Sequence, residues 1–135
     1  MNEKQLQLVT FEQAVKIKEL GFNCEVPTTD CYNKSGKFVE IYEDFSAPFF
    51  ENHNSEENYY SAPTVALALK WFRDAKNIFS TVEFTTETFK KGYFGKYFSF
   101  EDRNVNGSTF DKLKSNYEDA ESALLDELIN ILKSK

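Results

Sequence analysis

The strongest constraint on the fold is an apolar repeat near the end of the chain. Between residues 117 and 132, apolar side chains recur at steps of three and four residues, which places them on one face of an α-helix. The repeat comprises Tyr117, Ala120, Leu124, Leu125, Leu128, Ile131 and Leu132. Acidic residues crowd its start, and Lys133 and Lys135 follow it, in the order that the helix dipole favours. We therefore predict a long amphipathic helix with Ser115 or Asn116 as its N-cap.

Two more helices are predicted upstream. Thr10 and Gln13 have the spacing of a capping box, and Gly21 is placed to end the helix that follows. Pro63 suits the first turn of a central helix, where its missing N–H leaves no hydrogen bond unmade. The apolar face of that central helix comprises Val65, Ala68, Leu69, Phe72 and Ala75. Both helices therefore need another surface to cover one side.

The segments between the helices alternate with a period of two, as strands do. The β-prone runs 31–32 and 38–42 flank a turn that contains Gly36 and predict one hairpin. The alternating runs 78–85 and 93–100 predict a second hairpin. The order helix, hairpin, helix, hairpin, helix predicts an α+β fold, in which the two hairpins form a mainly antiparallel sheet with the three helices on one face.

The second hairpin is rich in aromatic residues on both of its faces. Phe94, Phe98 and Phe100 alternate with Tyr93 and Tyr97 along its second strand. Because Phe is more apolar than Tyr, we expect the three Phe rings in the core and the two Tyr rings half-exposed.

A chain of 135 residues with 41% hydrophobic side chains is expected to form one domain over residues 1–135. Its most polar stretch, 51–58, predicts a surface loop, and 103–116 predicts a turn and linker segment. The formal net charge of −6 opposes non-specific attraction to nucleic acids and to anionic membranes. Neither a secretory leader nor an apolar run long enough to span a bilayer is present, so we expect a cytoplasmic protein without a membrane partner.

The groups that catalysis or metal binding would need are dispersed along the sequence. His53 is the only histidine and lies in the polar loop, where we interpret it as solvated, although Glu51, Glu56 and Glu57 are nearby carboxylates. Cys24, Cys31 and His53 lack the paired spacing and the fourth ligand of a structural zinc site, so both cysteines are interpreted as reduced, inert thiols. The sequence thus predicts no catalytic residue, metal or cofactor. A small enzyme whose site the sequence does not reveal is retained as an alternative.

Aromatic side chains, at 16% of the chain, exceed what one small core normally uses. Leu67 and Trp71 widen the apolar face of the central helix, and Tyr59 and Tyr60 follow the polar loop. Trp and Tyr are favoured anchors of protein interfaces. The preferred hypothesis is therefore a non-enzymatic accessory protein that acts through protein–protein contact, either with itself as a homodimer or with another protein.

A second hypothesis concerns the segment 90–98, which contains three lysines, several aromatic side chains and no acid. Single-stranded nucleic acid is bound by positive charge together with aromatic rings on which the bases stack. The residues that would make these contacts are Lys90, Lys91, Tyr93, Lys96 and Tyr97. Because the overall charge opposes nucleic-acid binding, this hypothesis is the alternative to protein–protein contact.

Three short segments also carry a resemblance. They hold Phe11-Glu12-Gln13-Ala14 and Leu20-Gly21-Phe22, then Ser61-Ala62-Pro63-Thr64 and Trp71-Phe72-Arg73, then Tyr117-Glu118-Asp119-Ala120-Glu121 with Leu124, Leu125 and Leu128. In these segments the chain resembles a group of uncharacterised small proteins of gut-type bacteria and their tailed phages. No activity is assigned to that group, so the resemblance implies a phage-related or mobile-element context and supplies no catalytic residues.

Overall fold

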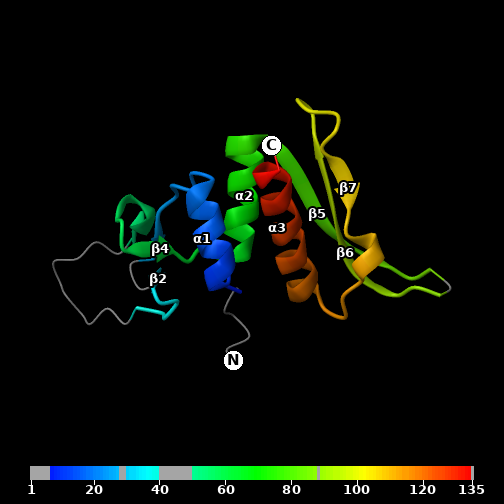
Figure 1. Ribbon diagram of the computed structural model, residues 1–135. Helices are drawn as coiled ribbons and strands as arrows, with labels where there is room; N and C mark the ends of the chain where they lie inside the picture. Colours follow the sequence, from blue (N-terminus) through cyan, green and yellow to red (C-terminus); the bar gives the residue numbers. More distant parts are fainter. Residues whose placement is uncertain (1–6, 28–29, 40–49, 88, 135) are drawn as a thin grey trace. The chain divides into compact units, whose positions relative to one another are not determined.

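The computed structural model describes residues 7–27, 30–39, 50–87 and 89–134. They fall into two compact units (Figure 1). The N-terminal unit is Leu8–Thr64, and the C-terminal unit is Val65–Lys135 together with Gln7. Across the described residues there are three α-helices and antiparallel sheets, so the predicted α+β class is confirmed. That the chain acts as a single domain over residues 1–135 stays a prediction.

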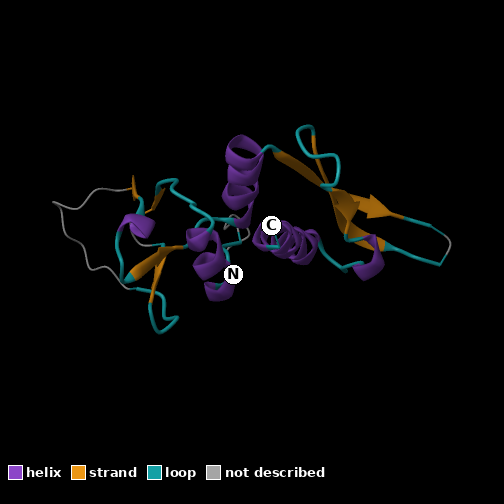
Figure 2. Cartoon of the chain, turned by 45° about the horizontal axis from the view of Figure 1, so that its top comes forward, coloured by secondary structure: helices purple, strands orange, loops and turns teal. Residues whose placement is uncertain are grey.

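The described residues of the N-terminal unit form one helix, a 3₁₀ turn and two small antiparallel sheets (Figure 2). Its helix begins at the predicted capping box, because Thr10 Oγ1 accepts from the Gln13 N–H at 3.1 Å and Gln13 Oε1 accepts from the Thr10 N–H at 3.0 Å. In chain order the elements are α1 (Phe11–Glu19), β1 (Val26–Pro27), β2 (Cys31–Asn33), β3 (Phe50–Glu51), η1 (His53–Ser55) and β4 (Tyr59–Ser61).

Strand pairing in this unit differs from the predicted hairpin. The turn at Gly36 is present, but Tyr32 and Phe38 meet at a single bridge, and residues 40–42 of the expected strand lie outside the described residues. β2 instead pairs along its whole length with β4, and β1 pairs with β3. The side chain of Asn54 holds β4 in place, because its Oδ1 accepts from the Ser61 N–H and its Nδ2 donates to the Phe22 carbonyl.

The C-terminal unit pairs two helices with a three-stranded antiparallel sheet of order β5-β6-β7. α3 packs against both long strands, while α2 packs against α3 and β5. The β5–β6 hairpin extends away from α2 and α3 in both ribbon views (Figures 1 and 2). The elements are α2 (Val65–Lys76), β5 (Ile78–Thr85), β6 (Gly92–Ser99), β7 (Asn106–Ser108), η2 (Phe110–Lys112) and α3 (Tyr117–Lys133).

The predicted apolar stripe of α3 forms the centre of this core. Ala120, Leu124, Leu125 and Leu128 are fully buried, and Ile129 joins them. Asn116 is the N-cap, with its side chain accepting from the Asp119 N–H at 2.8 Å. The ends of the predicted stripe are more open than its middle, since Tyr117 is 45% exposed and Ile131 and Leu132 are half-buried.

The faces of the second hairpin agree with the expectation at the start of β6 and differ from it farther along. Phe94 is buried at 7% exposure, with its ring edge-on to Phe110, and Tyr93 is half-buried. Gly95 lies directly against Leu124, so its side of β6 is the one that meets α3. Alternate residues share a face, and therefore Tyr97 points inward and is only 8% exposed. Phe98 and Phe100 lie on the opposite, open face and are 42% and 77% exposed. The prediction that these two Phe rings enter the core was wrong.

The segment 103–116, expected to be turn and linker, carries ordered structure. β7 pairs with β6, and η2 follows it. The Gly95 N–H donates to Thr109 Oγ1 at 2.7 Å, and Tyr93 exchanges two backbone hydrogen bonds with Lys114. The free edge of β6 explains this order, since its N–H and C=O groups need partners. Among the described residues, no helix has the length and apolar character that a bilayer crossing requires.

Candidate functional site

Three phenylalanine rings form a cluster on the open face of the C-terminal sheet. The register places Phe79 of β5 directly opposite Phe98 of β6, and their rings stack with centroids 5.6 Å apart and planes 19° apart. Phe100, just beyond β6, stands edge-on to both rings, at 5.5 Å from Phe79 and 5.1 Å from Phe98. We call Phe79, Phe98 and Phe100 the phenylalanine cluster. Its rings pack on one another while Phe98 and Phe100 remain open to solvent.

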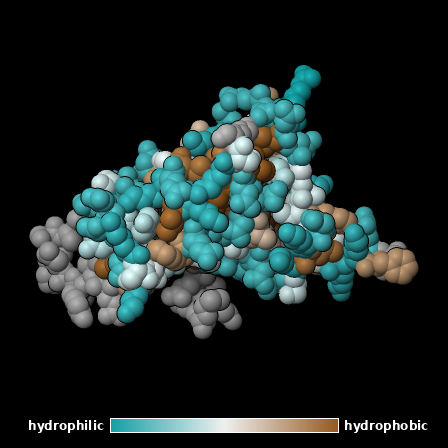
Figure 3. All heavy atoms as spheres, in the orientation of Figure 1, coloured by the Kyte–Doolittle hydropathy of each residue, from teal (hydrophilic) through white to brown (hydrophobic). Residues whose placement is uncertain are grey.

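Three charged side chains near the phenylalanine cluster have polar partners. Lys96 and Glu83 form an ion pair at 3.2 Å, and the Asn77 side chain donates to Glu101 Oε1 at 2.9 Å. The Lys96 amine is thus not a free positive charge at the rim of the cluster, which favours an apolar contact over one with a polyanion. Figure 3 shows hydrophobic residues reaching the surface over the β5–β6 hairpin, among hydrophilic side chains.

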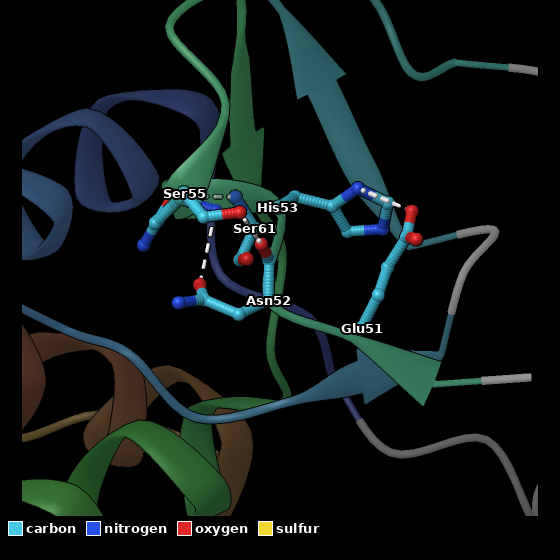
Figure 4. Close-up of polar contacts among 6 residues, drawn as sticks. Glu51, Asn52, His53, Ser55 and Ser61 are labelled. Carbon is cyan, nitrogen blue, oxygen red and sulfur yellow. Dashed lines mark hydrogen bonds and ion pairs between the residues drawn. The ribbon is translucent and has the colours of Figure 1, made fainter. Parts of the chain in front are cut away.

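The only histidine lies in the N-terminal unit and is buried, so the prediction of a solvated His53 was wrong. The Asn52 side chain caps η1 by accepting from the Asn54 N–H, and this tight turn brings the imidazole inward until it is 4% exposed. Its Nδ1 lies 3.0 Å from Glu51 Oε1 (Figure 4). A carboxylate at Nδ1 orients an imidazole, as it does in many catalytic and metal sites.

Among the residues that the structure describes, the further groups that such chemistry needs are not assembled around His53. Its Nε2 and the Ser61 Oγ are both buried without a hydrogen-bond partner among the described residues. Figure 4 shows the imidazole directed toward Glu51 and away from Ser61. Burial raises the pKa of the Cys31 thiol to about 11, with smaller contributions from Glu51 and Asp30, so this thiol is a poor nucleophile and metal ligand. The part of the chain that the structure describes holds no group of three metal-ligating side chains.

The four predicted interface residues lie in different units. Trp71 is buried on α2, where its ring packs edge-on against Phe72 and the Lys76 amine lies 5.3 Å from the ring centroid. Leu67 of the same helix is half-buried. Tyr59 of β4 is 38% exposed, while Tyr60 is half-buried and edge-on to Phe11. Their role in an interface stays a prediction.

The five predicted nucleic-acid contacts are divided between the two faces of the hairpin. Tyr93 and Tyr97 face α3, where Tyr93 meets the Tyr117 ring and Tyr97 donates to Glu127 Oε1 at 3.1 Å. Lys96 lies on the open face with its amine held by Glu83. The Lys90 amine sits 4.9 Å from the centroid of Phe110, and Lys91 is exposed. The arrangement therefore separates the tyrosine rings from the lysines.

The phenylalanine cluster was missed because the two faces of an alternating strand look equivalent in sequence. The signal that identifies the buried face is Gly95, whose missing side chain permits the close approach of α3. Comparison of the chain with protein-family models, with curated proteins and with solved structures gives no match. The resemblance to small bacterial and phage proteins stays a prediction.

Proposed function

We propose that this protein is a non-enzymatic accessory protein that acts through protein–protein contact, and that the phenylalanine cluster is its contact surface. One observation carries the proposal. Phe98 and Phe100 expose much of their surface while packing against each other and against Phe79. Contiguous exposed apolar surface of this kind is typical of interaction sites. Its rings are already ordered by mutual contact, so binding would cost little side-chain entropy.

The geometry of the rings favours a protein partner over a nucleic acid. Binding a run of bases needs several open ring faces, whereas Phe79 and Phe98 stack on each other and only Phe100 is largely open. Lys96, the lysine nearest to the cluster on this face, is paired with Glu83. The cluster exposes apolar area, and the lysine beside it is already paired. The surface that complements it best is therefore another apolar surface.

The occupant that we propose is a second copy of this chain. A fully buried aromatic side chain covers about 200 Å², so the open parts of Phe98 and Phe100 amount to roughly 240 Å² per copy. A standard interface buries about 800 Å² per partner, and the rings would therefore form only the apolar centre of a small, weak dimer. We expect a dissociation constant between about 1 µM and about 1 mM, the range of transient complexes.

Sedimentation velocity over a concentration series tests this proposal. The wild-type protein should shift from monomer toward dimer as its concentration rises, and the double variant Phe98→Ser/Phe100→Ser should remain a monomer. Phe50→Ser is the matched control, because Phe50 is also exposed, at 58%, but lies in the N-terminal unit. A wild type that stays monomeric throughout, or a double variant that dimerises as readily, would remove self-association through this face.

A cytoplasmic location and a phage or mobile-element context belong to the same proposal. They are supported by the sequence resemblance, by the acidic composition and by two cysteines that are not bridged to each other. The genes that flank the coding sequence test the context. Phage structural or packaging genes on either side support it, whereas a stable neighbourhood of housekeeping genes contradicts it.

A further inference from the structure

A cleft of about 160 Å³ lies within the C-terminal unit, between α2, β5 and α3. Its apolar part is formed by Ala66, Leu69, Val82 and Leu124. Polar side chains from two helices border this apolar part, with cations on α2 and with a phenol and a carboxyl on α3. They are Lys70, Arg73, Tyr117 and Glu121. The cleft thus combines an apolar floor with positive charge at one wall and hydrogen-bonding groups at the other.

The wall formed by Lys70 and Arg73 has N–H donors that are not used within the protein contacts described below. Arg73 uses its Nε to reach Asp74 Oδ1 at 3.3 Å, and Lys70 bonds the other oxygen of the same carboxylate. A guanidinium has five N–H donors in a planar fork, so the two terminal nitrogens of Arg73 can still bind an oxyanion in a bidentate manner. A carboxylate is the smallest organic group that matches this fork.

The opposite wall has a phenol that can donate and a carboxyl that can accept. Burial raises the pKa of Glu121, its hydrogen bond with Tyr117 opposes that rise, and the neighbouring Glu118 adds to it. The pKa of the Tyr117 phenol is also raised by burial, and Glu121 and Glu118 contribute. Tyr117 and Glu121 both line the cleft, so together they offer a donor and an acceptor to a hydroxyl or amino group of a ligand.

We propose that this cleft binds a small organic acid, with its carboxylate on Arg73 and Lys70, its apolar body on the floor, and a hydroxyl or amino group on Tyr117 and Glu121. One water molecule requires about 10–15 Å³ of cleft volume. A cleft of about 160 Å³ therefore accommodates a ligand of roughly ten non-hydrogen atoms. Hydroxybenzoic acids have this size and this order of groups. The inference is independent of the phenylalanine cluster, which lies on the open face of the sheet.

Titration of the full-length protein with 4-hydroxybenzoate, followed by ¹H–¹⁵N NMR, tests the proposal. Saturable shifts are expected at the lining residues of α2, β5 and α3, with a dissociation constant on the order of 1 mM for a ligand of this size. Arg73→Gln should weaken binding about tenfold or more, because it removes the fork that holds the carboxylate. Arg103→Gln is the charge-matched control, since Arg103 is exposed and does not line the cleft.

Two further probes separate this ligand class from simple anion binding. The neutral analogue 4-hydroxybenzamide should bind at least tenfold more weakly, because it lacks the carboxylate. Inorganic phosphate, which has the charge without the apolar body, should also bind more weakly. The proposal is overturned if no saturable shift reaches the cleft at about 20 mM 4-hydroxybenzoate. It is equally overturned if Arg103→Gln weakens binding as much as Arg73→Gln, or if phosphate binds as tightly as 4-hydroxybenzoate.

Discussion

At Gly95 the backbone of β6 lies against α3 with no side chain between them. A Cβ at this position would stand 2.7 Å from Leu124 Cδ1 and 2.9 Å from its Cβ, closer than packed atoms approach. This contact fixes the inward face of the strand and thereby leaves the Phe98 ring outside. At the scale of single residues, the position of the candidate interface thus depends on a missing side chain.

Gly95→Ala should therefore destabilise the protein by about 1–3 kcal/mol, the usual cost of overpacking a core. Urea unfolding measures this loss, and a double-mutant cycle with Leu124→Ala identifies its cause. Removing the Leu124 side chain makes room for the new methyl group, so the double variant should be less destabilised than the sum of the two single variants. Strictly additive losses would show that Leu124 is not what the methyl group meets.

The two cysteines differ in their surroundings, and this predicts different reactivity. Cys31 is buried, and its pKa is raised from 9.0 to about 11, so its thiolate fraction near pH 8 is about a hundredfold lower than that of an ordinary thiol. Cys24 is half-exposed. In the native protein iodoacetamide should modify Cys24 first and leave Cys31 largely unmodified, as peptide mass spectrometry would show. Urea should abolish the difference, and equal native rates would contradict the burial of Cys31.

At the scale of elements, the helices were predictable because their signals are local. The capping box at Thr10, the N-cap at Asn116 and the apolar stripe of α3 each lie within a few residues of the element that they define. The pairing of β2 with β4 joins residues nearly thirty positions apart. This pairing depends on side chains such as Asn54, which forms hydrogen bonds to two segments far apart in the sequence. The periodicity of apolar residues does not predict contacts of this kind. The burial of the His53 side chain could not be predicted from the sequence for the same reason.

Lys18 is a second side chain that connects segments far apart in the sequence, and its substitution tests how much such a contact contributes. From α1 its Nζ donates to the backbone carbonyls of Glu56 at 2.6 Å and Tyr59 at 2.8 Å, and it lies 4.9 Å from the centroid of the Tyr60 ring. Burial is the main reason that the pKa of this amine is lowered. These bonds attach the turn before β4 to the helix.

Lys18→Met keeps the aliphatic stem and removes the donor, so it should cost about 1 kcal/mol, a value at the low end for charged hydrogen bonds because the site is partly open. Hydrogen exchange at Tyr59–Ser61 should accelerate, since these residues lose their link to α1. Lys16→Met on the same helix is the control and should change neither quantity. Unchanged exchange in β4 for Lys18→Met would show that the bridge does not hold that strand.

At the scale of the whole molecule, the exposed aromatic side chains favour self-association, whereas the net charge opposes it. The aromatic surplus was evident from composition, whereas its location on the open face of β5 and β6 required the strand register and the position of α3. Each copy carries a formal charge of −6, so two copies repel each other when they meet. At the rim of the apolar contact the charges of Lys96 and Glu83 offset each other in an ion pair.

These opposing terms predict how salt changes self-association. Raising NaCl from about 0.05 M to about 0.5 M shortens the screening length from roughly 14 Å to roughly 4 Å, which weakens the repulsion while leaving the ring contacts intact. The dissociation constant measured by sedimentation equilibrium should therefore fall, by about two- to fivefold. Tighter association at higher salt is expected for an apolar contact between acidic subunits. A contact held by ion pairs would instead weaken as salt is added. If salt separates the copies, then charge and not the phenylalanine cluster holds them together.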